Sequence, residues 1–256
     1  MGDQYTDDGI LKLNKRKSKK GCVRFFVSGF GRFHGVDANP TTKILELLRA
    51  ETKEGSRDSF PEKVAVELCE IMEVSAEGCT QSLDQQFISN DQPHWTSVYL
   101  HLGVCTSTYF RMEEVAVNCA NFRCPDEKGY QPQDLPIDMT QLNTEYQRRC
   151  KLPLSDIVAK LELKGWEGKV QTSEDAGRFV CNYTYYQSLL RTDSYPNKLS
   201  LFIHVPHFDH IGEEDQLQFV KDAICTIADE ILKSPTFDKN TLEKGKQESQ
   251  NSCILI

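Results

Sequence analysis

Short apolar runs alternate with amphipathic segments along most of this 256-residue chain. Buried strands of a parallel sheet are typically continuous apolar runs, whereas helices bury positions that recur every three or four residues. The apolar runs that we expect to be strands are residues 22–27, 64–74, 95–103 and 199–206. The periodic segments that we expect to be helices are residues 80–88, 155–163 and 217–231. This order predicts a parallel-rich sheet covered by helices.

Residues that favour helix ends support this assignment. Asn39 followed by Pro40 is a favourable N-cap and first helical position, so we expect a further helix to begin there. Gly165 is placed to close the helix at 155–163, and Pro235 is placed to end the last helix.

The composition favours a single cytosolic domain. A hydrophobic fraction of 39% allows one sizeable core, and no apolar run reaches the roughly 18 to 20 residues that cross a membrane. Residues 1–20 lack the apolar stretch of a signal peptide, so we expect the ten cysteines to be reduced in the cytosol. We expect a basic arm at 1–20, one domain at 21–235 and a flexible tail at 236–256. The net charge of −8 disfavours nucleic acid as a partner, and we expect no metal or other cofactor.

Cys181 stands where a turn of small and polar residues leads into an amphipathic helix. A helix N-terminus presents unpaired N–H groups and the positive end of the helix dipole, which stabilise a thiolate and could later hold an oxyanion. We therefore expect a lowered thiol pKa and a nucleophilic role for Cys181. The alternative is a buried cysteine that only packs.

A thiol nucleophile requires a base, and His204 is the best placed of the six histidines. It stands near the carboxyl end of the apolar run 199–206, and such strand ends are where α/β sheets gather their chemistry. The alternative is a buried histidine with a purely structural role, hydrogen-bonded to a neighbouring carbonyl. His207 and His210 follow in a loop, where we expect them to be solvated.

A carboxylate would complete the arrangement by orienting the imidazole. Glu113 and Glu114 precede the alternating apolar residues Val115 and Val117, so a strand would point one carboxylate inward and the other to solvent. The pattern alone leaves open which of the two points inward.

Four separated segments of the chain together resemble the pyroglutamyl peptidase I family of cysteine exopeptidases. They occur in the family's order at residues 29–40, 113–132, 175–186 and 202–206. The resemblance spans residues 21–233. It implies a three-layer α/β/α sandwich around a mostly parallel, mixed sheet in a single domain. It also implies removal of N-terminal pyroglutamate from peptides.

Position by position, the resemblance places the family's nucleophile on Cys181, its base on His204 and its carboxylate on Glu113. A supporting arginine, which could help to hold the oxyanion, falls on Arg123. The residues that would line the pyroglutamate pocket are Phe30, Phe33 and Val180. Arg32 and His34 depart from the proline and glycine that many relatives carry at these positions.

These residue types suit the chemistry that the resemblance implies. Pyroglutamate is a neutral lactam, so an apolar pocket flanked by Phe30 and Phe33 would accept it and would leave the ammonium of an ordinary N-terminus unpaired. Cys181, activated by His204, would attack the pyroglutamyl carbonyl, and water would hydrolyse the resulting thioester.

The last four residues, CILI, fit a prenylation motif with Cys253 as the acceptor, or they are a frayed tail. One prenyl chain holds a membrane weakly, and the basic cluster Lys15–Lys20 could add attraction to anionic lipid, so part of the protein could be membrane-associated. An inactive, lipid-anchored interaction protein with the same fold is therefore one alternative function. The other is a zinc protein that uses Cys119, Cys124, His207 and His210.

Overall fold

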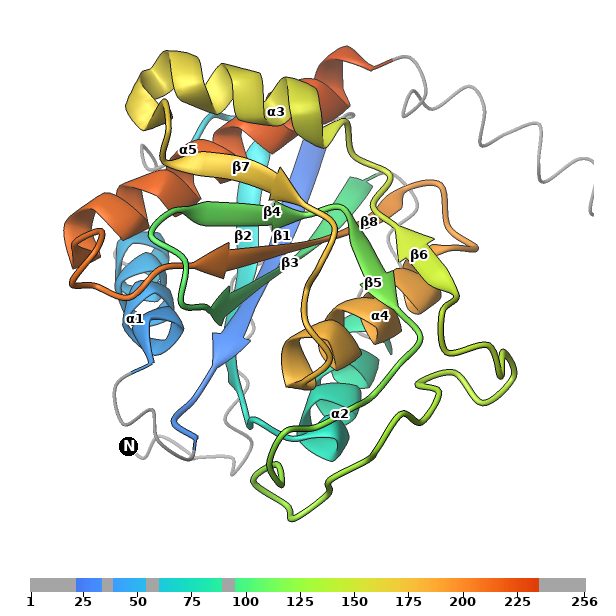
Figure 1. Cartoon of the computed structure of the whole chain (residues 1–256). Helices are drawn as coiled ribbons and strands as arrows, with labels where there is room; N and C mark the ends of the chain where they lie inside the picture. The colour runs from blue at the N-terminus through green and yellow to red at the C-terminus, as the bar shows by residue number, and fades with distance from the viewer. Residues whose placement is uncertain (1–21, 34–38, 54–59, 89–94, 235–256) are drawn as a thin grey trace, which may run out of the picture.

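A six-stranded sheet forms the middle layer of the molecule (Figure 1). The computed structural model describes residues 22–33, 39–53, 60–88 and 95–234. The strand order is β2-β1-β3-β8-β4-β7, and each pair of neighbours is parallel except β4 and β8. The strands are β1 (Cys22–Phe30), β2 (Val64–Met72), β3 (Trp95–Val104), β4 (Phe110–Glu113), β7 (Val170–Ser173) and β8 (Lys198–Val205). A separate antiparallel pair is formed by β5 (Val115–Val117) and β6 (Gln147–Arg149).

Helices cover both faces of this sheet, as Figure 1 shows. The helices on one face are α1 (Pro40–Lys53), α3 (Leu154–Leu161) and α5 (Glu213–Lys233). The helices on the other face are α2 (Ala76–Ile88) and α4 (Val180–Thr192). The predicted three-layer α/β/α sandwich with a mostly parallel, mixed sheet is therefore confirmed.

Local capping explains where some helices begin, and long-range contacts explain others. The Asn39 side chain accepts a hydrogen bond from the Thr41 backbone N–H at 3.1 Å, so the predicted cap of α1 is confirmed. Helix α2 begins four residues before its predicted start, at Ala76, whose N–H donates to the Asp126 carboxylate at 2.9 Å. A partner so distant in the chain leaves no local signal.

Two predicted boundaries differ in the structure. The sequence predicts a strand that ends before Phe30, but Phe30 is the last residue of β1, which is buried along its whole length. Helix α3 ends at Leu161, and a π-helical turn (η1, Glu162–Trp166) follows it. Gly165 closes that turn with a φ of 100°, a conformation that favours glycine.

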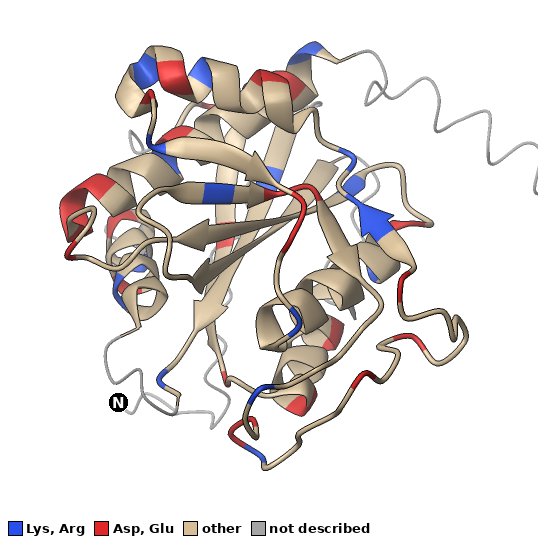
Figure 2. Ribbon diagram, in the orientation of Figure 1, with Lys and Arg blue, Asp and Glu red and all other residues tan. Residues whose placement is uncertain are grey.

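Apolar side chains fill the space on both sides of the sheet. The stripe predicted along the last helix is confirmed as core, since Val220, Ile224, Ile227 and Ile231 are buried. No helix within the described ranges is long and apolar enough to cross a membrane. Acidic and basic residues are both spread over the helices and loops around the sheet (Figure 2).

Several predictions concern residues outside the described ranges. They are the basic arm at 1–20 with its cluster Lys15–Lys20, the departure at His34, the helix stop at Pro235, and the tail at 236–256 with prenylation of Cys253. Prenylation of Cys253 stays a prediction, which the mass of the native protein would test.

Candidate active site

Cys181 is the second residue of helix α4, and the turn that precedes it has the predicted character. Gly177 adopts a φ of 77° there, and its N–H donates to the Asp175 side chain at 3.0 Å. Phe179 is the N-cap residue and has extended backbone angles. Because the first N–H groups of a helix lack partners within it, the backbone N–H of Cys181 lies among free donors. The predicted position of Cys181 at a helix N-terminus is confirmed.

The expected low pKa of Cys181 is wrong for the free protein. Burial among protein atoms raises the pKa of the thiol to about 12, and the nearby Cys79 and Cys105 act in the same direction. Arg123 lowers this pKa, but by less than burial raises it. Desolvation of the thiolate is the largest of these influences, so burial favours the protonated thiol. Any nucleophilic role requires a base that removes this proton.

His204 and Glu113 form a hydrogen-bonded pair in the interior. The distance between His204 Nδ1 and Glu113 Oε1 is 2.8 Å, and Glu113 is completely buried. The pair forms because β4 and β8 are antiparallel neighbours, which brings their side chains onto one face. Glu114 instead turns away and forms an ion pair with Arg149 at 2.5 Å. The expectation that one carboxylate points inward is confirmed, and that carboxylate belongs to Glu113.

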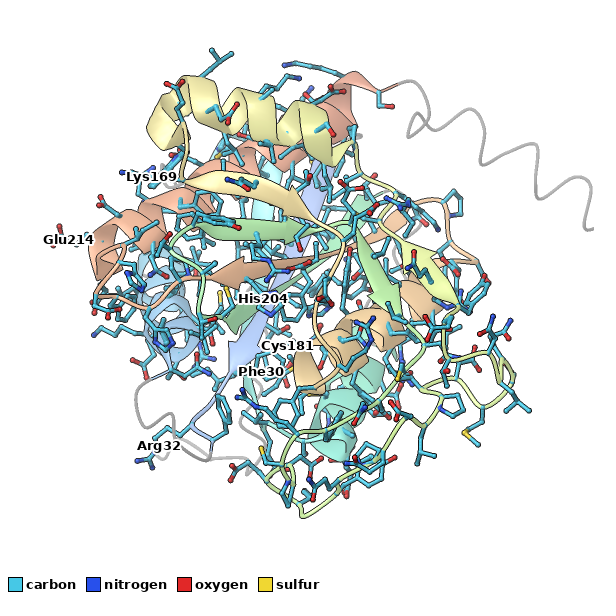
Figure 3. The ribbon with its side chains drawn as sticks, viewed as in Figure 1. Phe30, Arg32, Lys169, Cys181, His204 and Glu214 are labelled. Atoms are coloured by element: carbon cyan, nitrogen blue, oxygen red, sulfur yellow. The ribbon has the colours of Figure 1, made fainter. Side chains whose placement is uncertain are left out.

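Gly103 brings Cys181 and His204 to the same place. It faces His204 in the ladder between β3 and β8. A Cβ atom added to Gly103 would lie 3.1 Å from Cys181 Sγ and 2.7 Å from the Phe202 ring. The missing side chain therefore leaves room for the thiol beside the strand that carries the imidazole. Figure 3 shows Cys181, His204 and Phe30 in one region of the molecule.

Aromatic side chains surround this region. Phe30, Phe33, Val180 and Cys181 belong to one apolar cluster, as the predicted pocket requires. The Phe30 and Phe202 ring centroids lie 6.3 Å apart, and Phe202 lies 4.8 Å from the His204 ring. A chain of ring contacts thus leads from the end of β1 to the candidate base.

Phe179 is a site residue that the sequence analysis missed. Its ring lies 6.3 Å from Phe33 and 4.8 Å from Phe122, measured between centroids. The guanidinium of the exposed Arg123 lies 5.9 Å from the centre of the same ring, within the range of a cation–π contact. Its place two residues before Cys181 could have drawn attention to it. Arg123 is thereby held near the thiol.

The zinc hypothesis fails on placement. The described part of the chain includes Cys119, Cys124, His207 and His210. It contains no group of three or more histidine, cysteine, aspartate or glutamate residues that could hold a metal ion. Cys119 instead lies 3.8 Å from the Asp134 carboxylate. Cys181 forms no disulfide with any of the other described cysteines.

Comparison with known proteins places the chain in a family. The family model described as pyroglutamyl peptidase matches residues 23–219. A pyrrolidone-carboxylate peptidase of Fusobacterium nucleatum is 28% identical over 217 residues, which cover 82% of this chain and 92% of the relative. Another, of Pyrococcus furiosus, is 30% identical over 227 residues, which cover 82% of this chain and all of the relative.

Solved structures agree with this result. The pyrrolidone carboxyl peptidase of Thermococcus litoralis superposes with a TM-score of 0.70 at 23% identity and covers 84% of this chain and 98% of its own, which supports the fold. A mutant pyrrolidone carboxyl peptidase of Pyrococcus furiosus has a TM-score of 0.66 at 27% identity, with 81% of this chain and 99% of its own covered. The chain therefore belongs to the pyroglutamyl peptidase family.

Proposed function

We propose that this chain is a cysteine exopeptidase that removes N-terminal pyroglutamate from peptides, with Cys181, His204 and Glu113 as its catalytic residues. The assignment of roles rests on the 2.8 Å hydrogen bond between His204 Nδ1 and Glu113 Oε1. The Cys181 thiol lies beside this pair, in the space left by the missing side chain of Gly103. Membership of the family supports the reaction and the substrate class.

The hydrogen bond to Glu113 determines what His204 can do. It keeps the proton of the neutral imidazole on Nδ1, so Nε2 can accept the proton of the Cys181 thiol. Because burial raises the pKa of that thiol, His204 must take its proton when the sulfur attacks. Glu113 stabilises the imidazolium that results.

The reaction then proceeds in two halves. The sulfur of Cys181 bonds to the pyroglutamyl carbonyl carbon, and the oxyanion is held by N–H groups at the start of α4 and by Arg123. The imidazolium of His204 gives its proton to the peptide nitrogen, the C–N bond breaks, and the amine leaves. His204 next takes a proton from water, which attacks the thioester and releases pyroglutamate and the free thiol.

Specificity would come from the aromatic cluster. Phe30, Phe33 and Phe179 offer flat apolar surfaces to the lactam ring. An unblocked N-terminus carries an ammonium group, and burying it without a partner costs several kcal/mol. The site should therefore reject free amino termini by exclusion.

A panel of fluorogenic amides tests this proposal. We expect turnover of the pyroglutamyl amide, no turnover of the matching glutaminyl and alanyl amides, and loss of activity in Cys181→Ala with an unchanged circular dichroism spectrum. Cys225→Ala is the matched control, because Cys225 lies on α5 in the other helical layer and should retain full activity. A folded, reduced wild type without turnover would favour the alternative of an inactive interaction protein.

A further inference from the structure

Strand β4 carries a second charged residue beside the triad carboxylate. Figure 2 shows this strand with one basic and one acidic segment, and its sequence is Phe-Arg-Met-Glu. Arg111 and Glu113 are two residues apart, so their side chains leave the same face of the strand. Arg111 is also the cross-strand partner of His204. The three side chains therefore meet on one face.

Glu113 has few partners for a buried carboxylate. Its Oε1 lies 2.8 Å from His204 Nδ1 and 3.3 Å from Arg111 Nε. Its Oε2 has no hydrogen-bond partner among the described residues. An arginine is charged at every pH of interest. Arg111 is therefore the permanent counter-charge of Glu113 within the described part of the chain.

The other end of the Arg111 side chain reaches the turn before the nucleophile. Its Nη2 donates to Ser173 Oγ at 2.6 Å, and it also donates to the backbone carbonyl of Asp175. Asp175 in turn accepts the hydrogen bond that shapes the Gly177 turn. One guanidinium thus connects the carboxylate of the triad to the segment that leads into helix α4 and Cys181.

We propose that Arg111 is a positioning residue of the triad, which keeps Glu113 ionised and oriented toward His204 while holding the turn that carries Cys181. This inference rests on the function proposed above. Loss of the guanidinium removes a positive charge from beside the pair of Glu113 and His204. This loss favours proton binding by the pair and should move the acid limb of kcat/KM upward. Within the described part of the chain, Cys181 and Tyr185 on α4 are further titratable groups that face this carboxylate.

Two measurements on Arg111→Gln test the proposal. In kinetics with the pyroglutamyl amide, we expect kcat to fall by about 10-fold to 100-fold with little change in KM, and the acid limb of kcat/KM to move up by about one pH unit. In Arg111→Lys, which keeps the positive charge, the acid limb of kcat/KM should lie close to its wild-type position. Ser173→Ala is the control that removes one contact of Arg111 with this segment but leaves the positive charge beside Glu113, and it should leave the acid limb of kcat/KM unchanged. In NMR of histidine-labelled protein without substrate, the His204 ring should titrate at higher pH in Arg111→Gln.

The outcomes separate this inference from the proposed function. If wild type does not cleave the amide but the His204 titration moves in Arg111→Gln, the function fails and the role of Arg111 stands. The other outcome is an active wild type together with an Arg111→Gln variant that has the same acid limb of kcat/KM and the same His204 titration curve as wild type. That result would overturn the role of Arg111. Arg111→Met, which also removes the charge, replaces Arg111→Gln in both measurements if the latter does not fold.

Discussion

The two faces of the central sheet differ in what they bury. Strand β8 shows the contrast most clearly, because Leu199, Leu201, Ile203 and Val205 face the layer of α1, α3 and α5. The alternate residues Ser200, Phe202 and His204 face the layer of α2 and α4. Strand β3 repeats the pattern, with leucine and valine on one side and the polar or small residues Ser97, His101 and Gly103 on the other.

The polar residues of the second face satisfy one another below the candidate active site. The buried imidazole of His101 lies 2.7 Å from Ser28 Oγ and 2.8 Å from Ser188 Oγ, and Ser200 donates to Ser188 at 2.8 Å. This network joins three strands to helix α4, which carries Cys181. Apolar packing on one face therefore supplies stability, whereas fixed polar contacts on the other face hold the reacting groups in place.

The largest loss of activity should follow substitution of Glu113, the carboxylate on the polar face. Glu113→Gln keeps the size of the side chain but removes its charge, so we expect kcat to fall by about 10²-fold to 10⁴-fold because the imidazolium is no longer stabilised. The thermal midpoint should fall, since Arg111 loses its counter-charge. Steady-state kinetics and calorimetry on the same sample check both. Glu114→Gln, on the solvent side, should retain nearly full activity.

Substitutions on the apolar face should reduce stability strongly and kcat little. Phe219 stacks on Phe110 with ring centroids 3.5 Å apart. We expect Phe219→Ala to reduce the free energy of unfolding by about 3 to 5 kcal/mol while kcat per folded molecule changes little. Urea denaturation and active-site titration measure the two quantities. Leu163→Ala, at a site that is 88% exposed, should change stability by less than about 0.5 kcal/mol. A large drop in kcat for Phe219→Ala would show that the two faces are not independent.

Gly103 tests how closely the polar face is packed around the thiol. An added methyl group would lie 3.1 Å from Cys181 Sγ, so Gly103→Ala must displace the sulfur or Phe202. We expect kcat/KM to fall by about 10-fold to 100-fold and stability to fall by about 1 to 3 kcal/mol. Gly212→Ala is the matched control, because no atom of the described residues lies within 4 Å of its added Cβ. Equal activity in the two variants would mean that the thiol does not lie where the structure places it.

At neutral pH the buried histidine of the polar network should have the smallest effect, but below pH 6.5 it should make stability depend on pH. Burial lowers the pKa of His101 from 6.5 to about 3, so below pH 6.5 the unfolded chain binds a proton that the folded chain does not. Stability should therefore fall as the pH drops from 6.5 toward 3, by roughly 1.4 kcal/mol per pH unit from this group. His101→Gln cannot titrate, and we expect a correspondingly flatter profile in denaturation at several pH values. His207→Gln, outside the core, should follow wild type. Identical slopes for His101→Gln and wild type would contradict this account.

The parts of the site that follow from local patterns could be predicted from the sequence. Alternation near Val115 and Val117 indicated that one glutamate points inward, and the turn before Cys181 indicated the helix start. The long-range contacts left no such signal. Asp126 caps α2 from 50 residues away, and Gly103 matters only because β3 and β8 become neighbours. The error on the Cys181 pKa has the same origin, because a helix end can be predicted locally but desolvation by the assembled fold cannot.

Labelling with pyroglutamyl chloromethyl ketone tests the central claim most directly. This reagent carries the proposed recognition group next to an electrophile that captures a thiol irreversibly. We predict one label per molecule, mapped by peptide mass spectrometry to Cys181, blocked by a pyroglutamyl peptide and lost in His204→Ala. Labels spread over Cys105, Cys124 and other cysteines at the same rate, or labelling of Cys181 that a pyroglutamyl peptide does not slow, would contradict the proposed nucleophile and its pocket.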